Sequence, residues 1–398
     1  MWKAAKAVLI GALVICIFAV ALAASFNLAP KYFRVSYQRT ADEVVSAAQT
    51  AIQKIAVAEE KKKVISRIPT PEAVKAIYIT NWVAGTKHLR DPLIKLVEDT
   101  EINAVVIDIK DYTGKIGFIP NDPDLLATGA GEARIADIDA LIQELHNKGI
   151  YVIGRLSVFQ DSYMVKAEPE WAVKKSSDTS AVWKDYKGVS WLDAGDERVW
   201  NYATKIALES WNRGFDEINL DYIRFPSDGN MKDIYFPASE GKIKQDVLES
   251  FLKHISGELK KENIPISVDL FGMVTTNTDD LGIGQVLEKA LPYVDYVAPM
   301  VYPSHYPATW NGLANPAEHP YEVIKISMSR AMERAVAMGI STDKLRPWLQ
   351  DFDLGADYTA DMVRAQIKAT NDIGLDSWMI WNASNKYTNG AYLPESTQ

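Results

Sequence analysis

Residues 214–226 read GFDEINLDYIRFP and contain a short strand pattern that ends on charged residues. From Ile218 to Tyr222 every second side chain is apolar or aromatic, while Asn219 and Asp221 lie between them. Successive side chains of a strand point to opposite faces, so the amide and the carboxylate share one face at the strand's carboxyl end. In (β/α)₈ barrels the chemistry is found at the carboxyl ends of the strands, and the pattern indicates such an end.

From residue 74 onward, short apolar segments alternate with longer amphipathic stretches, which is typical of a parallel sheet with crossover helices. Strands are predicted at residues 76–82, 104–108, 151–157, 217–224, 266–271, 296–302, 346–352 and 377–382. Helices are predicted at residues 138–148, 198–211, 244–261, 321–338 and 359–372. Eight strands close a (β/α)₈ barrel, which is therefore the predicted fold.

The ends of the chain lead to separate predictions. Residues 7–24 form an uninterrupted apolar run behind two lysines, long enough for a membrane helix. We expect 1–24 to be a membrane anchor, or a signal segment whose cleavage releases a secreted protein, so that the barrel lies on the extracytoplasmic face. Residues 25–72 are predicted as a helical stalk and linker, followed by the barrel domain at 73–398. Residues 383–398 are too broken for a final helix, so we expect the 40–63 helix, or a partner chain, to cover the gap after the last strand.

Composition excludes several classes of function. The 398 residues include 52 acidic and 43 basic ones, with a net charge of -9 and no basic stripe, so nucleic acid is not an expected partner. The sole cysteine, Cys16, lies in the apolar run, which leaves no cysteine pair for a disulfide or a thiolate site. The histidines are scattered and no Walker or dinucleotide motif is present, so we expect no metal and no cofactor.

The alternation rule brings more ionisable side chains to the carboxyl mouth of the predicted barrel. Asp269 on strand 266–271 faces inward beside Asp221, and Asp108, Lys110 and Arg155 face inward from the second and third strands. Burying so many charges is costly unless they pair with one another or meet a polar ligand. The sequence therefore predicts either a binding site or an ion-paired layer closing the barrel.

Other side chains at the strand ends are candidates for substrate contacts. Arg224 shares with Asp108, Lys110 and Arg155 the choice between substrate binding and an ion-paired layer. Aromatic rings at strand ends can stack on the apolar faces of sugars. The remaining substrate-binding candidates are Asn219, Tyr302, His305, Gln350 and Trp381, together with Asp193 and Asp351, which could equally cap loops.

Three motifs resemble a known family: NLDYIRFP at 219–226, VDLFG at 268–272 and APMVYP at 298–303. Over residues 73–392 the chain resembles a bacterial family of glycoside-hydrolase-like (β/α)₈ barrels. More distantly it is similar to barrel glycosidases of the α-amylase and α-galactosidase type, in which an aspartate ending strand four is the nucleophile. Asp221 matches that position. Asn219 and Asp269 depart from the α-amylase pattern, which has an arginine and a glutamate at those places.

The resemblance implies a retaining glycosidase, and the expected location outside the cytoplasm suggests an envelope or extracellular polysaccharide as its substrate. Asp221 is then expected to attack the anomeric carbon and Asp269 to protonate the leaving oxygen, with the carboxyl groups about 5 Å apart. The acid needs a raised pKa, supplied by burial and by repulsion from its partner. Two alternatives remain open: a non-catalytic carbohydrate-binding barrel tethered to the envelope, and a lyase or aldolase that uses the Lys110 amine.

Overall fold

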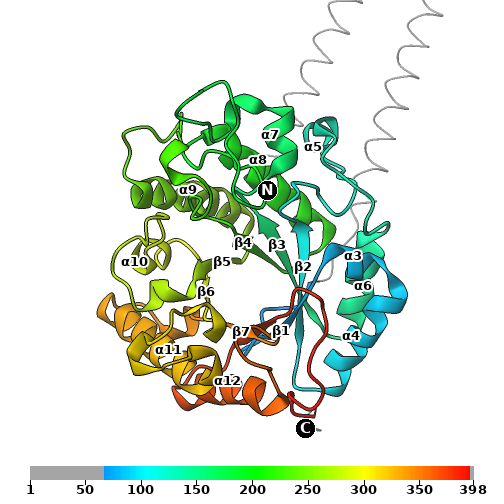
Figure 1. Ribbon diagram of the computed structural model, residues 1–398. Helices are drawn as coiled ribbons and strands as arrows, with labels where there is room; N and C mark the ends of the chain where they lie inside the picture. The colour runs from blue at the N-terminus through cyan, green and yellow to red at the C-terminus, as the bar shows by residue number, and fades with distance from the viewer. Residues whose placement is uncertain (1–66, 395–398) are drawn as a thin grey trace, which may run out of the picture. The chain divides into compact units, whose positions relative to one another are not determined.

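The computed structural model describes residues 67–394, which form a closed barrel of eight parallel strands paired in chain order (Figure 1). The strands are β1 (Lys75–Ile79), β2 (Ala104–Lys110), β3 (Tyr151–Ser157), β4 (Glu217–Asp221), β5 (Ile266–Phe271), β6 (Tyr296–Met300), β7 (Trp348–Gln350) and β8 (Trp378–Trp381). β8 pairs with β1 and closes the sheet. The predicted (β/α)₈ fold and all eight predicted strands are confirmed.

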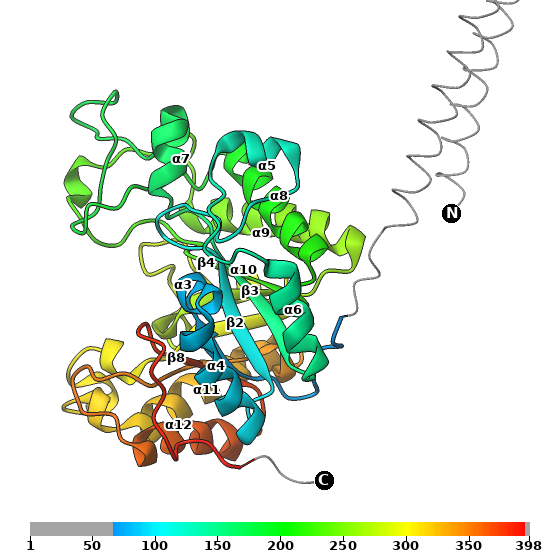
Figure 2. The same cartoon turned by 90° about the vertical axis from the view of Figure 1, so that its right-hand side faces the viewer.

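Helices surround the barrel on its outer side (Figures 1 and 2). They are α3 (Asn81–Gly85), α4 (Lys87–Asp99), α5 (Pro123–Thr128), α6 (Ile138–Asn147), α7 (Ser162–Ala167), α8 (Glu197–Arg213), α9 (Lys244–Leu259), α10 (Leu287–Ala290), α11 (Pro320–Ala337) and α12 (Ala360–Asp372). The five predicted helices correspond to α6, α8, α9, α11 and α12. Gly214 ends α8 in a left-handed conformation, which a glycine adopts without steric cost.

Two apolar clusters follow from the alternation along the strands. The larger lies between the strands and the helices and includes Ile107, Ile218 and Val268. The smaller lies inside the barrel and includes Val106 and Trp348. Successive side chains along a strand belong to different clusters, as a period of two requires. The predicted inward face of each strand is therefore largely confirmed.

β2 departs from the predicted alternation near its end. A register shift between Asp108 and Lys110 places an extra residue on β2, so that Lys110 pairs with Leu156 of the outward-facing cluster. The alternation predicts that Lys110 faces the barrel axis. The register shift makes this prediction wrong, and Lys110 faces outward. Its ammonium group forms an ion pair with Asp161 at 2.6 Å and is 1% exposed.

β4 is also shorter than predicted, because the chain turns sharply after Asp221. Tyr222 has a φ of 52°, in the left-handed region that a bulky side chain rarely occupies. The turn breaks the period-two alternation that assigns Tyr222 to the outer face. The Tyr222 side chain instead lies at the carboxyl mouth of the barrel.

The segment after β8 packs along the outside of the barrel without forming a helix. Asn385 donates a hydrogen bond to the Tyr78 carbonyl and accepts one from the Thr80 amide, which fastens the segment to the end of β1. Tyr392 stacks on Trp378 of β8 with the ring centroids 6.4 Å apart. Chain beyond β8 thus covers the gap for which the 40–63 helix or a partner is predicted; that helix lies outside the described residues.

Between residues 67 and 394, no helix combines the length and the apolar character needed to cross a membrane. The predicted anchor at 7–24 and most of the predicted stalk lie outside these residues.

Candidate active site

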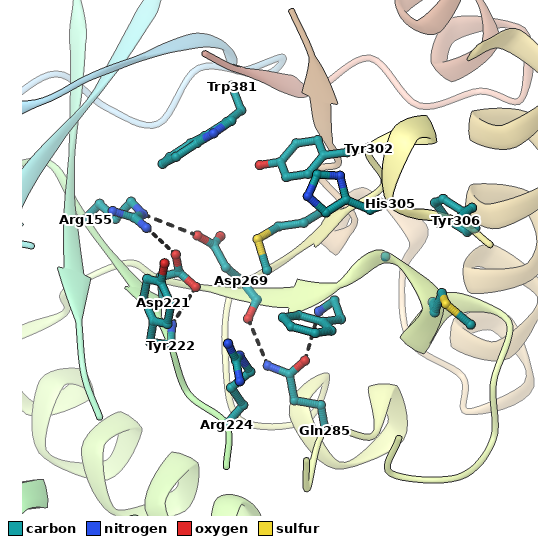
Figure 3. Close-up of a pocket in the computed structure, with 14 residues that line it drawn as sticks. Arg155, Asp221, Tyr222, Arg224, Asp269, Gln285, Tyr302, His305, Tyr306 and Trp381 are labelled. Carbon is teal, nitrogen blue, oxygen red and sulfur yellow. Dashed lines mark hydrogen bonds and ion pairs between the residues drawn. The ribbon is translucent and has the colours of Figure 1, made fainter. Parts of the chain in front are cut away.

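A pocket of about 330 Å³ lies at the carboxyl ends of the strands, within the size range of small-molecule sites (Figure 3). Seven residues predicted from the sequence line it: Arg155, Asp221, Arg224, Asp269, Tyr302, His305 and Trp381. Both predicted catalytic aspartates are therefore in one pocket, on the neighbouring strands β4 and β5.

Arg155 of β3 connects the acids of the site. One guanidinium nitrogen donates to Asp108 at 2.7 Å, and another donates to Asp221. The Arg155 Nε lies 3.9 Å from Asp269 Oδ2. Burial alone lowers the pKa of Arg155, but the charges of Asp221 and Asp108 outweigh it and raise that pKa well above its usual value. Arg155 therefore stays charged and holds the carboxylates together.

Asp221, the last residue of β4, accepts hydrogen bonds on both of its carboxylate oxygens. Its Oδ2 accepts a hydrogen bond from the Arg155 guanidinium, and its Oδ1 accepts one from the Tyr222 backbone N–H. Both donors stabilise a carboxylate anion. The left-handed conformation of Tyr222 belongs to the same turn that supplies this N–H.

Asp269 of β5 has the opposite environment. Its side chain is 1% exposed, and burial raises its pKa well above the ordinary value, as does the charge of nearby Asp221. Arg155 and the hydrogen bonds from Asn219 and Trp348 oppose that rise. Both hydrogen bonds, at 2.8 Å, end on Oδ1, so the acid proton belongs on Oδ2, the oxygen nearer Arg155.

Asp108 and Lys110 do not line the pocket. Asp108 accepts hydrogen bonds from Tyr78 Oη at 2.5 Å and from Arg155, and burial raises its pKa. Asp108 and Arg155 form an ion-paired layer behind the pocket. The binding site and the ion-paired layer, predicted as alternatives, therefore both occur, and Arg155 belongs to both. Lys110 lies between Asp161 and the Tyr202 ring of α8, away from the pocket. The alternative of a Lys110 amine catalyst loses its geometric basis.

Asn219 and Gln350 support the pocket from outside its lining. Asn219 is fully buried and donates to Asp269 and to Ser267. Gln350 accepts hydrogen bonds from the Ser304 amide and hydroxyl at 3.2 and 2.9 Å. The Ser304 backbone leads directly into His305, so Gln350 fixes the loop that carries this pocket residue.

Asp193 and Asp351 serve as loop fasteners, the second of the two roles considered for them. Asp193 accepts hydrogen bonds from the backbone amides of Gly195 and Ala238. Asp351 accepts hydrogen bonds from Thr388 and from the Tyr392 hydroxyl. Neither carboxylate lines the pocket, because both are used to tie loops together.

Aromatic side chains form one wall of the pocket. Trp381 stacks on Tyr78, with ring centroids 4.0 Å apart and an interplanar angle of 23°. Tyr302 and His305 form an edge contact at 5.3 Å. Burial lowers the pKa of His305, which favours the neutral imidazole. This wall offers flat apolar surface next to the acid pair.

Several lining residues were not predicted as site residues, among them Tyr222, Gln285 and Met300. Gln285 accepts a hydrogen bond from the Phe271 amide at 2.9 Å and donates to the carbonyls of Ile223 and Asp269. It thereby joins the ends of β4 and β5. Gln285 lies in a loop without periodicity, so no sequence signal marks it.

The buried acid pair at the carboxyl end of a (β/α)₈ barrel defines the class of protein: a barrel of the glycoside hydrolase type. The profile of a family described as "Putative glycosyl hydrolase domain" matches residues 76–387, and the chain belongs to this family. The resemblance based on the three motifs is thus confirmed. No curated protein matches the chain.

Solved structures add relatives of the barrel. A hypothetical protein from Ruminiclostridium thermocellum is 33% identical, with 52% of this chain and 98% of that chain covered and a TM-score of 0.44. The PgaB (BpsB) glycoside hydrolase domain from Bordetella bronchiseptica is 14% identical, with 78% and 94% covered and a TM-score of 0.55. A class V chitinase from Pseudomonas fluorescens is 12% identical, with 80% and 97% covered and a TM-score of 0.47. The PgaB domain shares the fold of this chain.

Proposed function

We propose that this protein is a retaining glycoside hydrolase in which Asp221 is the nucleophile and Asp269 the general acid and base. The observation that carries the proposal is that two aspartates with opposite surroundings contact one guanidinium in one pocket. Asp221 accepts hydrogen bonds from the Arg155 guanidinium and from a backbone N–H, whereas burial and the charge of Asp221 raise the pKa of Asp269. Two carboxyl groups with separated protonation states are what acid-assisted glycoside cleavage requires.

In the first step, Asp221 attacks the anomeric carbon while the glycosidic C–O bond breaks. The proton on Asp269 Oδ2 passes to the leaving oxygen, and a glycosyl–Asp221 ester forms. In the second step, water attacks the anomeric carbon, Asp269 takes the water proton, and Asp221 leaves as a carboxylate.

The coupling between the two acids supports this alternation of roles. The negative charge of Asp221 is one cause of the raised pKa of Asp269. That charge disappears when Asp221 becomes an ester, so the pKa of Asp269 falls at the stage where a base is needed. Arg155 remains beside both acids and offsets the negative charge that returns when the ester is hydrolysed.

The test is hydrolysis of a panel of envelope and extracellular glycans, followed as new reducing ends. We expect Asp221→Asn to reduce turnover by at least about a thousandfold, since it removes the attacking group. The matched control is Asp376→Asn, which changes an exposed aspartate outside the pocket and should keep parental turnover. Hydrolysis by Asp221→Asn at the parental rate would refute the assignment of the nucleophile.

The stereochemical outcome tests the double displacement separately. Nuclear magnetic resonance of the first-formed product should show the anomeric configuration of the substrate, because two inversions restore it. Inverted product would show that a water attacks directly and that Asp221 acts as a base.

One observation favours the second candidate, a carbohydrate-binding barrel without turnover. Arg155 pairs with Asp108 and Asp221, so its charge is satisfied by the protein itself. On this alternative no glycan is cleaved, and Asp221→Asn binds sugars as the parent does. Reducing ends released by the parent alone would exclude it.

We also place the enzyme at the outer face of the membrane, held by residues 7–24 and acting on an envelope or extracellular polysaccharide. The support is the apolar run behind Lys3 and Lys6. In cell fractionation, the full chain should stay in the membrane after alkaline extraction, and a variant lacking residues 7–24 should not. Recovery of the full chain in the cytosolic fraction would contradict this location.

A further inference from the structure

Arg224 differs from the other buried arginines in the part of the chain that the structure describes. Arg155, Arg334 and Arg346 each form an ion pair with an aspartate or glutamate. Arg224 is equally buried, at 8% exposed, but it forms no ion pair with a carboxylate of the described residues, although the charges of Asp221, Asp228 and Asp185 act on it from farther away. It lines the pocket together with the two proposed catalytic aspartates.

The hydrogen bonds of Arg224 leave one side of its guanidinium unused. Nη1 donates to the Phe225 carbonyl and to Ser227 Oγ, both at 3.1 Å, and both acceptors are neutral. Within residues 67–394, neither Nε nor Nη2 donates a hydrogen bond. These two donors form one planar edge, which fits the two oxygens of a carboxylate.

The surroundings of Arg224 stabilise a cation only in part. The rings of Trp191 and Phe271 lie 4.7 and 4.8 Å from its guanidinium carbon. Such rings attract a cation but accept no strong hydrogen bonds. Burial lowers the pKa of Arg224, and the charges of Asp221, Asp228 and Asp185, none of which pairs with it directly, offset this only in part. A bound anion would supply both the missing charge and the missing acceptors.

Resting on the proposed glycosidase function, we propose that the pocket selects an acidic sugar whose carboxylate binds the Nε–Nη2 edge of Arg224. Figure 3 shows Arg155 and Arg224 approaching the acid pair from two sides. Arg155 is neutralised by Asp108 and Asp221, which leaves Arg224 to receive the substrate's charge. One guanidinium carries a single charge, which matches a singly charged carboxylate better than a doubly charged phosphate.

The proposal is tested by binding of monosaccharides, which contain no glycosidic bond to cut. Glucuronate, galacturonate and mannuronate are each compared with the corresponding neutral hexose by titration calorimetry or saturation-transfer magnetic resonance on the full chain. We expect at least one uronate to bind at least tenfold more tightly than its hexose. Arg224→Gln should remove this difference, and Arg224→Lys should keep part of it, because an ammonium group retains the charge without the fork.

The control variant is Arg330→Gln, which changes an exposed arginine of α11 and should keep the parental preference. Thermal denaturation of the Arg224 variants shows whether they fold. Equal binding of uronate and hexose in all three pairs, no binding of any uronate, or a preference that persists in Arg224→Gln would each overturn the proposal. Glucose 6-phosphate binding more tightly than every uronate would replace the carboxylate with a phosphate and also overturn it.

Failure of this inference is distinguishable from failure of the proposed function. A uronate preference that depends on Arg224, without hydrolysis of any glycan, leaves the acidic-sugar site in place and removes the glycosidase. If a neutral glycan is hydrolysed in an Asp221-dependent reaction and no uronate binds, the glycosidase function is kept and the acidic-sugar site is rejected.

Discussion

The two ends of the barrel interior treat buried charge differently. At the amino end, Glu217 and Arg346 are both fully buried and pair at 2.9 Å. Tyr151 and Ser267 add hydrogen bonds to the same carboxylate. At the carboxyl end, Asp108, Asp221 and Asp269 surround Arg155, while the hydrogen bonds of Arg224 within residues 67–394 go only to neutral acceptors.

This difference separates stability from function. Acid and base occur in equal number at the amino end, and Ile68 packs against the interior cluster. The pair balances its own charge, although Nε and Nη2 of Arg346 have no hydrogen-bond partner among the described residues. Burial, together with the charge of Asp221, raises the pKa of Asp269 at this end, which a structural layer does not need but a proton donor does. The unequal distribution of charge is what marks the carboxyl end as the reactive one.

The largest effect is expected on catalysis when Asp269 at the carboxyl end is replaced. Asp269→Asn should lower turnover of glycosides with poor leaving groups by about 10²–10⁴-fold, the usual contribution of general acid catalysis. Aryl glycosides with acidic leaving groups should lose far less in the first step, because they need no proton. The measurement is kcat/KM for the two substrate classes, and equal losses for both would argue against Asp269 as the acid.

The next largest effect is on stability at the other end. Glu217→Gln should lower the free energy of unfolding by about 3–5 kcal/mol, because it leaves Arg346 charged and uncompensated. Chemical denaturation measures this change. Replacing both partners, as Glu217→Leu with Arg346→Met, should recover much of the loss. If Glu217→Gln were as stable as the parent, the Glu217–Arg346 pair would not be what stabilises the amino end.

The pH dependence sharpens the assignment of the acid. Asp269 must be protonated for the first step, so kcat/KM should fall as pH rises through its raised pKa. Trp348→Phe removes a hydrogen bond that favours the anion, so the alkaline fall should move to higher pH. The control is Trp82→Phe at an exposed tryptophan, which should leave the profile unchanged. A shift to lower pH for Trp348→Phe would contradict the assigned donor direction.

The same group links stability to pH. The folded-state pKa of Asp269 is raised, so its contribution to stability is fully present below the unfolded value of about 3.9 and is lost as pH rises through the folded value. The free energy of unfolding should therefore fall with pH over this window, and Asp269→Asn should reduce that slope. Denaturation curves at several pH values measure it; an unchanged slope would place the buried proton elsewhere.

The smallest effect concerns Thr70, in the segment that precedes β1 at the amino end of the barrel. Thr70 Oγ1 lies 3.1 Å from Tyr151 Oη, which also donates to Glu217. Thr70→Val keeps the shape of the side chain and removes one hydrogen bond, so it should cost about 0.5–1.5 kcal/mol of stability. Turnover per folded molecule should not change. A loss of turnover in this variant would show that the two ends of the barrel are coupled.

Local periodicity was sufficient to predict the barrel and its central acids. Ile218, Asn219 and Asp221 alternate in a segment too short and regular for another interpretation, and the structure gives them the predicted faces. Asp269 follows by the same rule on β5. Alternation is a property of the strand itself, so neighbouring residues suffice to predict it.

The prediction was wrong where the strand geometry changes. Lys110 turns outward after the register shift against β3, and Tyr222 turns into the pocket through its left-handed backbone. The position of Lys110 depends on the pairing of β2 with β3, and that of Tyr222 depends on a single backbone dihedral angle. Gln285 was missed because it lies in a loop without periodicity, and its contacts with Phe271 and Ile223 form only when the chain folds.

The eight strands, most of their inward faces and the acids at their carboxyl ends can be predicted from the sequence, because they follow from a period of two along each strand. Which charges meet depends on the folded barrel. There Arg155 pairs with Asp108 and Asp221, Lys110 pairs with Asp161, and Arg224 donates hydrogen bonds only to neutral acceptors. The reason is physical: the cost of a buried charge depends on neighbours from other strands, and closure of the barrel selects those neighbours.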